Sequence, residues 1–269
     1  MGKAGALEAF DLTEKVAIVT GSSYGIGFDI AEGLAEAGAS VVICARNLEK
    51  CEEAAERLHK LGTKTLALRC DVTVSDDMDQ LVSSSIKEFG KIDILVNNAG
   101  GAGTRAAPEN TSLDDWNRVI KTDLTSLLIC VKAVGPRMIK QKSGKIINIS
   151  SVFGKEGSDI IDDIAYHTAK GGVENFTKAL ALKWAKYSIN VNTVAPGFFP
   201  TPMAKELLDD IGDAIAKVTP LGRLGQGKDL KGAIVFLSSP ASDFITGQFI
   251  CVDGGWLIRG SGIQRAVMG

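Results

Sequence analysis

Hydrophobic positions along this chain form short, almost unbroken apolar runs that alternate with longer stretches of helical periodicity. Unbroken apolar runs are typical of strands that are buried on both faces of a sheet. The expected strands cover residues 15–20, 40–45, 65–70, 92–96, 145–149, 189–194 and 248–252. The expected helices cover residues 28–35, 48–61, 75–89, 113–140, 166–187 and 230–237. Because hairpin signals are almost absent, this alternation predicts an α/β fold with a doubly wound, seven-stranded parallel sheet and helices on both faces.

Two segments depart from this regular pattern. The long helix over 113–140 contains Gly135 and Pro136, and we expect it to bend there. The segment 203–227 is expected to be mobile. Together with the residues before it, over about 198–227, it is expected to close as a lid over bound ligands, with Gly197 and Gly212 allowing the movement.

The composition is that of an ordinary globular protein, with 269 residues, 45% hydrophobic and 23% charged. We expect a single domain over residues 1–269, with a tail over about 1–10. A formal net charge of −2 without a basic run does not indicate a nucleic-acid or membrane surface. The apolar runs are too short to span a bilayer and the start lacks the apolar core of a signal peptide, which predicts a cytoplasmic protein. With two histidines and scattered cysteines, no metal site is expected.

Three glycines follow the first expected strand, in the run TGSSYGIG. Gly21 permits a tight turn, Gly25 lets a pyrophosphate approach the backbone, and Gly27 lets the next helix pack closely on the strand. The N-terminus of that helix would face the phosphate charge. A strand, a glycine-rich turn, a helix and a second strand within about thirty residues form the unit that binds dinucleotides. The sequence therefore predicts a single-domain Rossmann fold that binds a nicotinamide dinucleotide.

The residues after the second strand bear on which dinucleotide is bound. An acid at this position would bond the ribose hydroxyls and repel a 2′-phosphate, but the chain has Ala45 and Arg46 there. Arg46 can pair with a phosphate, so we predict a preference for NADP(H) over NAD(H). The alternative is that Arg46 caps a surface turn. Tyr24 stands at a position where a second basic residue would have strengthened the prediction.

A candidate acid–base group lies further along the chain. Tyr166 and Lys170 are four residues apart on an expected helix and so share one face, and the preceding loop can bring Ser151 to them. An ammonium beside a phenol lowers the pKa of the phenol toward neutral pH, where it can exchange a proton with a carbonyl or alcohol oxygen. Ser151 would hydrogen-bond the same oxygen. The alternative is a surface pair without chemistry.

In their order and spacing these motifs resemble the short-chain dehydrogenase/reductase family over residues of about 10–256. The matching motifs are TGSSYGIG, Asp71-Val72, NNAG, the serine before YHTAK, PGFFPT and the terminal VDGG. The resemblance implies hydride transfer between a nicotinamide and a carbonyl carbon. It implies that Ser151 positions the substrate oxygen, that Tyr166 is the acid/base, and that Lys170 lowers its pKa and holds the nicotinamide ribose. It also implies a homotetramer built on the helices over 113–140 and 166–187 and on the C-terminal strand.

The family's cofactor contacts can be carried over residue by residue. They are Gly21, Ser23, Tyr24, Gly25, Ile26, Gly27, Arg46, Asp71, Val72, Asn98, Ala99, Gly100, Tyr166, Lys170, Pro196, Gly197, Phe199 and Thr201. Asp123, a further candidate catalytic residue, stands where the family often has asparagine, which helps to hold a proton-relay water through its backbone carbonyl; an aspartate can offer the same carbonyl. The loop between Ser151 and Tyr166 is longer than in many members. Either extra residues bulge out at 158–163, or Ser150 takes the role given to Ser151.

The substrate is indicated less directly, because variable loops read it. The segments FDLTEKVAIVT, SYGIGF, AEGLAEAGASVV, ARNLEK and ITGQFICVDGGW look most like gluconate 5-dehydrogenase-type reductases, which interconvert sugar acids and their keto forms. In that interpretation Arg105 would bind the substrate carboxylate, with Ser151 and Phe153 as further substrate contacts. A solvated loop arginine is the alternative.

Two further hypotheses stand beside this one. A 3-oxoacyl-[acyl-carrier-protein] reductase would dock an acidic carrier protein on a basic cluster. The candidate residues are Arg137, Lys140, Lys142 and Lys145. Basic residues near a helix C-terminus also complement the helix dipole without any partner. A protein of another class would bind NADP(H) without catalysis, although the intact serine, tyrosine and lysine argue against it.

Overall fold

The computed structural model describes residues 5–259, and its centre is one sheet of seven parallel strands. The strands are β1 Val16–Thr20, β2 Ser40–Ala45, β3 Thr65–Arg69, β4 Ile94–Asn97, β5 Gly144–Ile149, β6 Ile189–Pro196 and β7 Phe249–Val252. Their order across the sheet is β3-β2-β1-β4-β5-β6-β7, and every neighbouring pair is parallel. The predicted fold class, a doubly wound Rossmann-type sheet, is confirmed.

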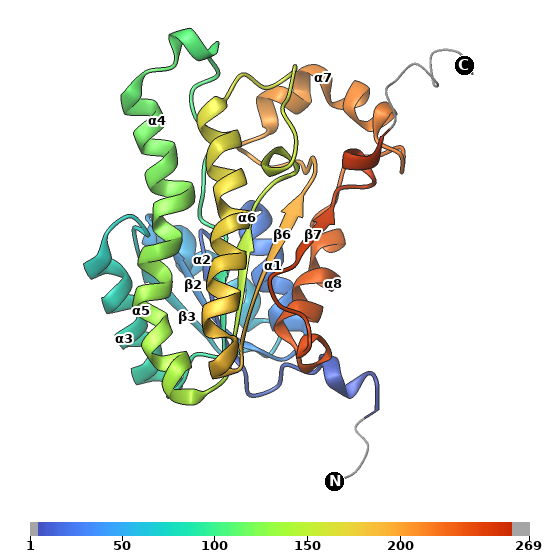
Figure 1. The fold of residues 1–269 in the computed structure, drawn as a ribbon. Coiled ribbons are helices and arrows are strands. Elements are labelled where there is room, and N and C mark those ends of the chain that lie inside the picture. The colour runs from blue at the N-terminus through green and yellow to red at the C-terminus, as the bar shows by residue number, and fades with distance from the viewer. Residues whose placement is uncertain (1–4, 260–269) are drawn as a thin grey trace.

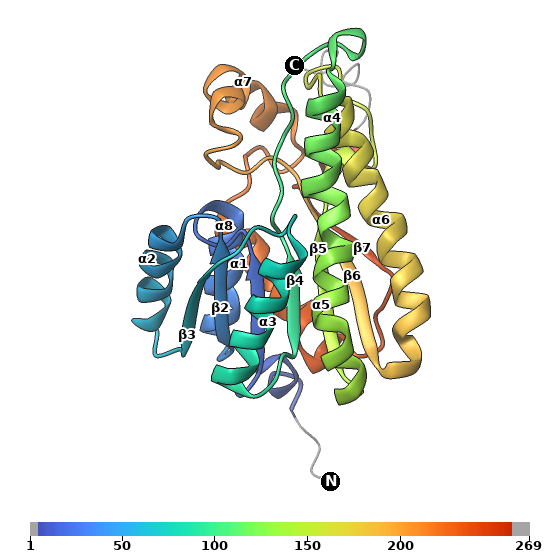
Figure 2. The ribbon, with the colours of Figure 1, turned by 90° about the vertical axis from the view of Figure 1, so that its left-hand side faces the viewer.

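Helices cover both faces of the sheet (Figures 1 and 2). They are α1 Gly25–Glu36, α2 Leu48–His59, α3 Ser75–Phe89, α4 Leu113–Ile120, α5 Ser126–Gln141, α6 Ile164–Trp184, α7 Lys205–Val218 and α8 Gly227–Ser238. Buried residues of α1, α2 and α8 belong to one hydrophobic cluster, and those of α3, α5 and α6 to another. The sheet separates the two clusters, so each helical layer has its own core.

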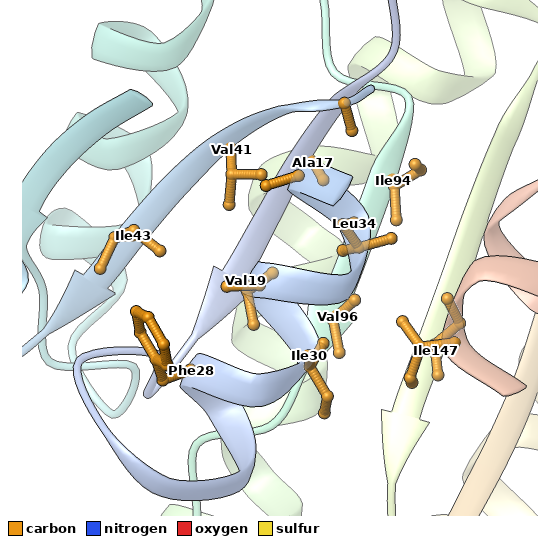
Figure 3. Packing of buried hydrophobic residues seen from close by; sticks show 14 of the residues in the cluster. Ala17, Val19, Phe28, Ile30, Leu34, Val41, Ile43, Ile94, Val96 and Ile147 are labelled. Atoms are coloured by element: carbon orange, nitrogen blue, oxygen red, sulfur yellow. The ribbon is translucent and has the colours of Figure 1, made fainter. Parts of the chain in front are cut away.

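The central strands are apolar at most positions because both of their faces are buried. In β1, Ala17 and Val19 pack toward α1, while Ile18 between them packs into the cluster on the opposite face. Figure 3 shows the first of these faces, where Ile30 and Leu34 of α1 lie over the strands. This two-sided burial explains why the strands appear in the sequence as unbroken apolar runs.

The strand order creates a crevice where a ligand can bind. β1 lies between β2 and β4, so the chain leaves the carboxyl ends of β1 and β4 in opposite directions. In open α/β sheets, ligands bind at such a switch point. α4 and α7 lie beyond the carboxyl ends of the strands and flank this edge (Figures 1 and 2).

The predicted long helix over 113–140 is confirmed, but it is not α-helical throughout. α4 and α5 are separated by a turn of π-helix, η3, at Lys121–Thr125, whereas Pro136 lies inside α5. A π-turn inserts about one extra residue per turn, which shifts the phase of the helix without ending it. Apolar spacing on the two sides therefore still looks like one helix in the sequence.

The segment 203–227, predicted only as mobile, contains a whole helix. α7 has non-helical backbone at Ile211, with φ −126° and ψ 15°. Its apolar side chains, including Leu207 and Ile215, pack with Phe198 and Trp256 in a separate small cluster. The amphipathic pattern that supports α7 is split by this kink, so the periodicity on either side of it is short.

Two remaining expectations concern the chain ends and membranes. Within the predicted tail, Glu8–Phe10 forms a short 3-10 helix, and residues 1–4 lie outside the described residues. Between residues 5 and 259, no helix is both long and apolar enough to cross a bilayer.

Candidate active site

A cavity of about 820 Å³ opens at the carboxyl edge of the sheet, at the switch point between β1 and β4. Every residue that the sequence suggested for catalysis, cofactor or substrate lines it. They are Gly21, Ser23, Tyr24, Gly25, Ile26, Gly27, Arg46, Asp71, Val72, Asn98, Ala99, Gly100, Arg105, Asp123, Ser151, Phe153, Tyr166, Lys170, Pro196, Gly197, Phe199 and Thr201. The fold thus brings segments from the whole length of the chain to one cavity.

The glycine-rich loop, residues 21–27 from the end of β1 into the first turn of α1, is shaped for an anion. Gly21 has φ +65°, and Gly25, the first residue of α1, has φ +59°. A Cβ at Gly27 would lie 2.3 Å from the carbonyl oxygen of Gly21, so only glycine fits there. No side chain caps the N-terminus of α1, which leaves its first N–H groups free for a ligand. These features fit the pyrophosphate of a dinucleotide.

Asn98 holds this loop to the neighbouring strand. Its side-chain Nδ2 donates to the carbonyl oxygens of Thr20 at 2.9 Å and Gly21 at 3.1 Å. The backbone N–H groups of Asn98 and Ala99 both donate to the Thr20 hydroxyl, at 3.0 Å. The floor of the cavity between β1 and β4 is therefore tied together by hydrogen bonds.

At the far end of the cavity, a second basic residue lies beside Arg46, which was the only one that the sequence indicated there. Lys50, in the first turn of α2, places its Nζ 5.7 Å from the centre of the Tyr24 ring, and both residues line the cavity with Arg46. Sequence reasoning missed Lys50. The available signal was its place three residues after Asn47, whose side chain caps α2 by accepting from the Lys50 N–H at 3.0 Å.

Arg46 is exposed and, within residues 5–259, makes no side-chain hydrogen bond or ion pair that would mark it as a cap of the turn. Its charge acts on Asp71, the carboxyl at the end of β3. Burial raises the pKa of Asp71, but hydrogen bonds from Thr73 and the charges of Arg46 and Lys121 outweigh burial and leave that pKa below its ordinary value. Asp71 is therefore held as a carboxylate.

The N-terminus of α6 carries the candidate acid–base pair. Tyr166 and Lys170 lie on one face of this helix, with Lys170 Nζ 5.3 Å from the centre of the Tyr166 ring. The helix is capped by Asp163, whose Oδ1 accepts from the Tyr166 N–H at 2.9 Å. Lys170 Nζ also donates to the carbonyl oxygen of Ile149 at 3.2 Å. The ammonium is thus fixed between the end of β5 and the phenol.

The two serines after β5 have different surroundings. The Ser150 hydroxyl donates to the carbonyl oxygen of Lys170 at 2.9 Å and is buried in that contact. Ser151, which lines the cavity as Ser150 does, has a hydroxyl that accepts from the Phe153 N–H at 3.2 Å and helps to lower the pKa of Tyr166. The loop between Ser151 and Tyr166 turns at Ser158, whose hydroxyl accepts from two backbone N–H groups. This turn lies within the segment 158–163.

The charge balance around Tyr166 differs from the expectation that Lys170 dominates it. Asp123 Oδ2 lies 3.1 Å from Lys170 Nζ, and both side chains are almost fully buried. Burial raises the pKa of Tyr166; Lys170 and the Ser151 hydrogen bond lower it, whereas Asp123 and Asp163 raise it. The resulting pKa lies above the ordinary tyrosine value, opposite to the direction that the sequence predicted.

The loop after β4, residues 100–107, is held by carboxylates from three other segments, and we call it the clamped loop. The Gly101 N–H donates to Asp123 Oδ1 at 2.9 Å. The Gly103 N–H donates to Asp163 Oδ2 at 2.5 Å, and the Thr104 N–H to Asp115 Oδ2 at 2.6 Å. Sequence reasoning assigned no role to Asp115 or Asp163. Their one sequence signal is that acids are favoured at helix N-termini.

Arg105 extends from the clamped loop at the edge of the cavity. It is exposed, and among the described residues its guanidinium makes no ion pair. Arg118, the neighbouring arginine that lines the cavity, is already bound to Asp115 at 2.5 Å. Arg105 therefore offers a positive charge that the described part of the chain does not neutralise.

The basic residues considered for carrier-protein docking lie away from this cavity. Arg137 and Lys140 are near the end of α5, which runs from the cavity edge toward the opposite edge of the sheet (Figure 2). Lys145, at the start of β5, is paired with Asp243 at 2.8 Å. The cluster is thus separated from Ser151 by the length of β5.

Comparisons with known proteins agree with this geometry. Residues 21–257 match the family model described as enoyl-(acyl carrier protein) reductase. The chain is 39% identical to 5-keto-D-gluconate 5-reductase of Escherichia coli strain K12 over 253 residues, 93% of this chain and 98% of that protein. It is 40% identical to a 3-oxoacyl-[acyl-carrier-protein] reductase of Synechocystis over 249 residues, 92% of this chain and 98% of that protein.

A solved structure shares the whole fold. It is a gluconate 5-dehydrogenase from Burkholderia cenocepacia J2315 in complex with NADP and tartrate, 39% identical, with a TM-score of 0.90 over 96% of this chain and all of that one. The similarity extends over nearly the full length of both chains and includes the cavity-forming segments. The chain therefore belongs to the short-chain dehydrogenase/reductase family, whose members are oxidoreductases that use a nicotinamide cofactor on alcohol or ketone groups.

Proposed function

We propose that this enzyme interconverts a hydroxylated sugar acid and its keto form with NADP(H), as gluconate 5-dehydrogenase does. The observation that carries the proposal is the Arg105 guanidinium, which has no ion pair among residues 5–259 and lies at the edge of the same cavity as Ser151 and Tyr166. A guanidinium binds a carboxylate through two parallel hydrogen bonds and so fixes its orientation. When Arg105 holds the carboxylate of a small acid, a carbonyl carbon several bonds from that carboxylate can reach Ser151 and Tyr166.

In this proposal the chain's own residues bind the substrate oxygen and move its proton. The Ser151 hydroxyl hydrogen-bonds that oxygen, and Tyr166 gives its phenolic proton to it in reduction or takes the proton back in oxidation. Lys170, fixed by the Ile149 carbonyl, holds the positive charge beside the phenol. When bound, the nicotinamide cofactor supplies or accepts the hydride.

The two serines provide a direct test of these roles. We expect Ser151→Ala to lower kcat by about 100-fold or more, because a hydrogen bond to the reacting oxygen is lost. Ser150→Ala should keep most of the activity and lose about 1 kcal/mol of folding stability, because its hydroxyl bonds only the Lys170 carbonyl. Steady-state kinetics measures kcat of both variants, and urea unfolding measures their folding stability. Full activity of Ser151→Ala would remove it from the proposed mechanism.

The proposed preference for NADP(H) rests on two cations at the end of the cavity beyond Tyr24. Arg46 and Lys50 are both exposed there and can approach a 2′-phosphate. Loss of one charge-assisted contact should weaken binding by about 1.5–3 kcal/mol, roughly 10- to 100-fold. We expect Arg46→Gln and Lys50→Gln to raise the Kd of NADPH and leave that of NADH nearly unchanged. Fluorescence titration measures both constants, with Lys60→Gln at the far end of α2 as the control.

The proposed substrate class is tested with NADPH and two carbonyl compounds, 5-ketogluconate and a small β-ketoacyl ester. Turnover of the keto acid is expected, with Arg105→Gln raising its KM by about 10-fold or more while kcat changes little. Arg118→Gln is the control, since that guanidinium is already paired with Asp115. Turnover of the ester alone would instead support a 3-oxoacyl reductase.

A 3-oxoacyl-[acyl-carrier-protein] reductase remains the second candidate because the Synechocystis enzyme is as similar in sequence as the gluconate enzymes. The position of Arg137 and Lys140, far from the cavity, favours a small substrate over a docked carrier protein. A protein that binds NADPH but turns over neither compound would support the non-catalytic hypothesis.

We also propose a homotetramer. Large apolar side chains are exposed on the helices that the resemblance implicated, including Leu128 on α5, 51% exposed, and Leu182 on α6, 80% exposed. Light scattering gives the mass in solution. A monomer at working concentration would contradict the proposal.

A further inference from the structure

The Asp123 side chain occupies a position that is unusual for a carboxylate. It lies in the π-turn η3 between α4 and α5, with a side chain that is 0% exposed. One carboxylate oxygen accepts from the Gly101 N–H at 2.9 Å, and the other lies 3.1 Å from Lys170 Nζ. The carboxylate thus connects the clamped loop to the ammonium beside the acid–base tyrosine.

The ion pair is tightly packed on the side of Gly100 and borders the cavity on another side. A Cβ placed on Gly100 would lie 2.9 Å from Asp123 Oδ2 and 3.2 Å from Lys170 Nζ. The Lys170 ammonium has one further contact, the Ile149 carbonyl oxygen at 3.2 Å. The two charges are therefore held against each other by the Gly101 N–H, which binds the carboxylate, and by the Ile149 carbonyl oxygen, which binds the ammonium.

This geometry changes the net charge that Tyr166 experiences. An ammonium alone would stabilise the phenolate, but an ammonium and a carboxylate in contact have a net charge of zero. The other charged group facing the phenol is the Asp163 carboxylate at the start of α6, which also disfavours the phenolate. Ser151, on the remaining side, is neutral and donates or accepts a hydrogen bond.

We propose that the Asp123 carboxylate is a positioning residue that neutralises Lys170 and keeps Tyr166 protonated, so that the site is set for carbonyl reduction at neutral pH and for alcohol oxidation only in alkaline solution. Reduction needs the neutral phenol as a proton donor, and oxidation needs the phenolate as a proton acceptor. The inference rests on the proposed role of Tyr166 but not on the identity of the substrate. Burial is the largest cause of the raised pKa of Tyr166, and the Asp123 carboxylate raises that pKa further.

The first test uses the cofactor-free protein and no substrate. The chain has three tyrosines, so the ultraviolet absorbance of tyrosinate can be followed against pH, and subtraction of the Tyr166→Phe titration isolates Tyr166. The wild-type midpoint should lie above about 10, the ordinary value for tyrosine. A midpoint below about 10 would overturn the proposal, even if no variant could be studied.

The second test removes the carboxylate. Asp123→Asn, with Asp123→Asn/Tyr166→Phe for subtraction, should lower the midpoint by about one pH unit or more, because Lys170 is then unopposed. Asp115→Asn is the matched control, since it removes a carboxylate from the clamped loop without removing one from Lys170, and its midpoint should equal that of the wild type. Equal midpoints for wild type and Asp123→Asn, with native circular dichroism, would contradict the proposal.

The third test is the pH profile of catalysis. The high-pH limb of kcat/KM for reduction, and the low-pH limb for oxidation, should both move to lower pH in Asp123→Asn by the same amount as the tyrosinate midpoint. A purely structural role would reduce kcat without moving these limbs. If the tyrosinate titration shifts, but the enzyme neither reduces the keto acid nor oxidises the corresponding hydroxy acid, the charge inference holds and the proposed substrate fails.

Discussion

The glycine-rich loop and the clamped loop both line the cavity, but their shapes have different causes. The glycine-rich loop is shaped by missing side chains, since a Cβ at Gly27 would meet the Gly21 carbonyl oxygen at 2.3 Å. The clamped loop is shaped by acids from elsewhere in the chain, which accept hydrogen bonds from Gly101, Gly103 and Thr104. The first loop depends on local sequence, and the second on residues between 11 and 60 positions away.

This difference suggests how the two halves of the site can change. A dinucleotide loop that tolerates only glycine has little freedom to vary, which suits a cofactor shared by a whole family. A loop held by separate carboxylates can be reshaped by changing one distant acid while its own sequence stays the same. The half of the site that we assign to the substrate is therefore the more adjustable half.

The largest effect is expected when the glycine-rich loop is filled. In Gly27→Ala the new Cβ must displace backbone atoms, so we expect a loss of about 1–3 kcal/mol of folding stability. NADPH binding should be lost as well, because the turn that faces the phosphates is displaced. Urea unfolding and fluorescence titration measure the two effects.

The control for this substitution is a glycine with space around it. Gly232 in α8 has no atom within 4 Å of its would-be Cβ. Gly232→Ala should therefore stabilise the protein by about 0.5–1 kcal/mol, because alanine is the better helix former. Wild-type stability and cofactor affinity in Gly27→Ala would show that packing does not constrain the loop.

A smaller effect is expected when the clamped loop loses the buried carboxylate of Asp163. Asp163 is 4% exposed and accepts from the N–H groups of Gly103 and Tyr166. Asp163→Ala should lower stability by about 1–2 kcal/mol, as loss of a helix cap does, and should raise the substrate KM. The Kd of NADPH should change much less, since the glycine-rich loop is untouched.

Asp115→Ala is the matched variant for the same loop. Asp115 binds the single N–H of Thr104 and a half-exposed arginine, so its removal should lower stability by less than about 1 kcal/mol. Thermal unfolding and steady-state kinetics compare the two variants. If Asp115→Ala lowered stability and raised the substrate KM more than Asp163→Ala did, Asp163 would not be the main residue that holds the loop.

The smallest effect is a dependence of the clamped loop on acid pH. Hydrogen bonds from Thr104 and Arg118 hold the pKa of Asp115 below its ordinary value. Its contribution to stability is therefore present above the unfolded pKa of about 3.9 and is lost as the pH falls through the lower, folded pKa. Hydrogen exchange at the Thr104 N–H, corrected for its intrinsic rate, should show reduced protection in acid.

The N–H groups of the glycine-rich loop provide the comparison for this experiment. They have no carboxylate partner in the described structure, since Gly21 and Ser22 donate to the Cys44 carbonyl oxygen. Their corrected protection should stay constant over the same pH range. Equal losses in both loops would mean that acid loosens the whole edge of the sheet and not the clamp.

Much of the fold and the cofactor half of the site followed from the sequence alone. Strands buried on both faces are mostly apolar, and a glycine-rich turn between strand and helix has few other uses. Tyr166 and Lys170 share a helix face because they are four residues apart. Each of these features depends on interactions within a few residues, and so it can be recognised in a linear pattern.

Only the tertiary structure decided how charge is arranged around the acid–base pair. The π-turn at η3, which periodicity did not reveal, places Asp123 against Lys170, a residue 47 positions later in the chain. That contact and burial together reverse the direction in which the pKa of Tyr166 moves. A pKa depends on every charge and on all the solvent excluded nearby, and those are set by packing between distant segments.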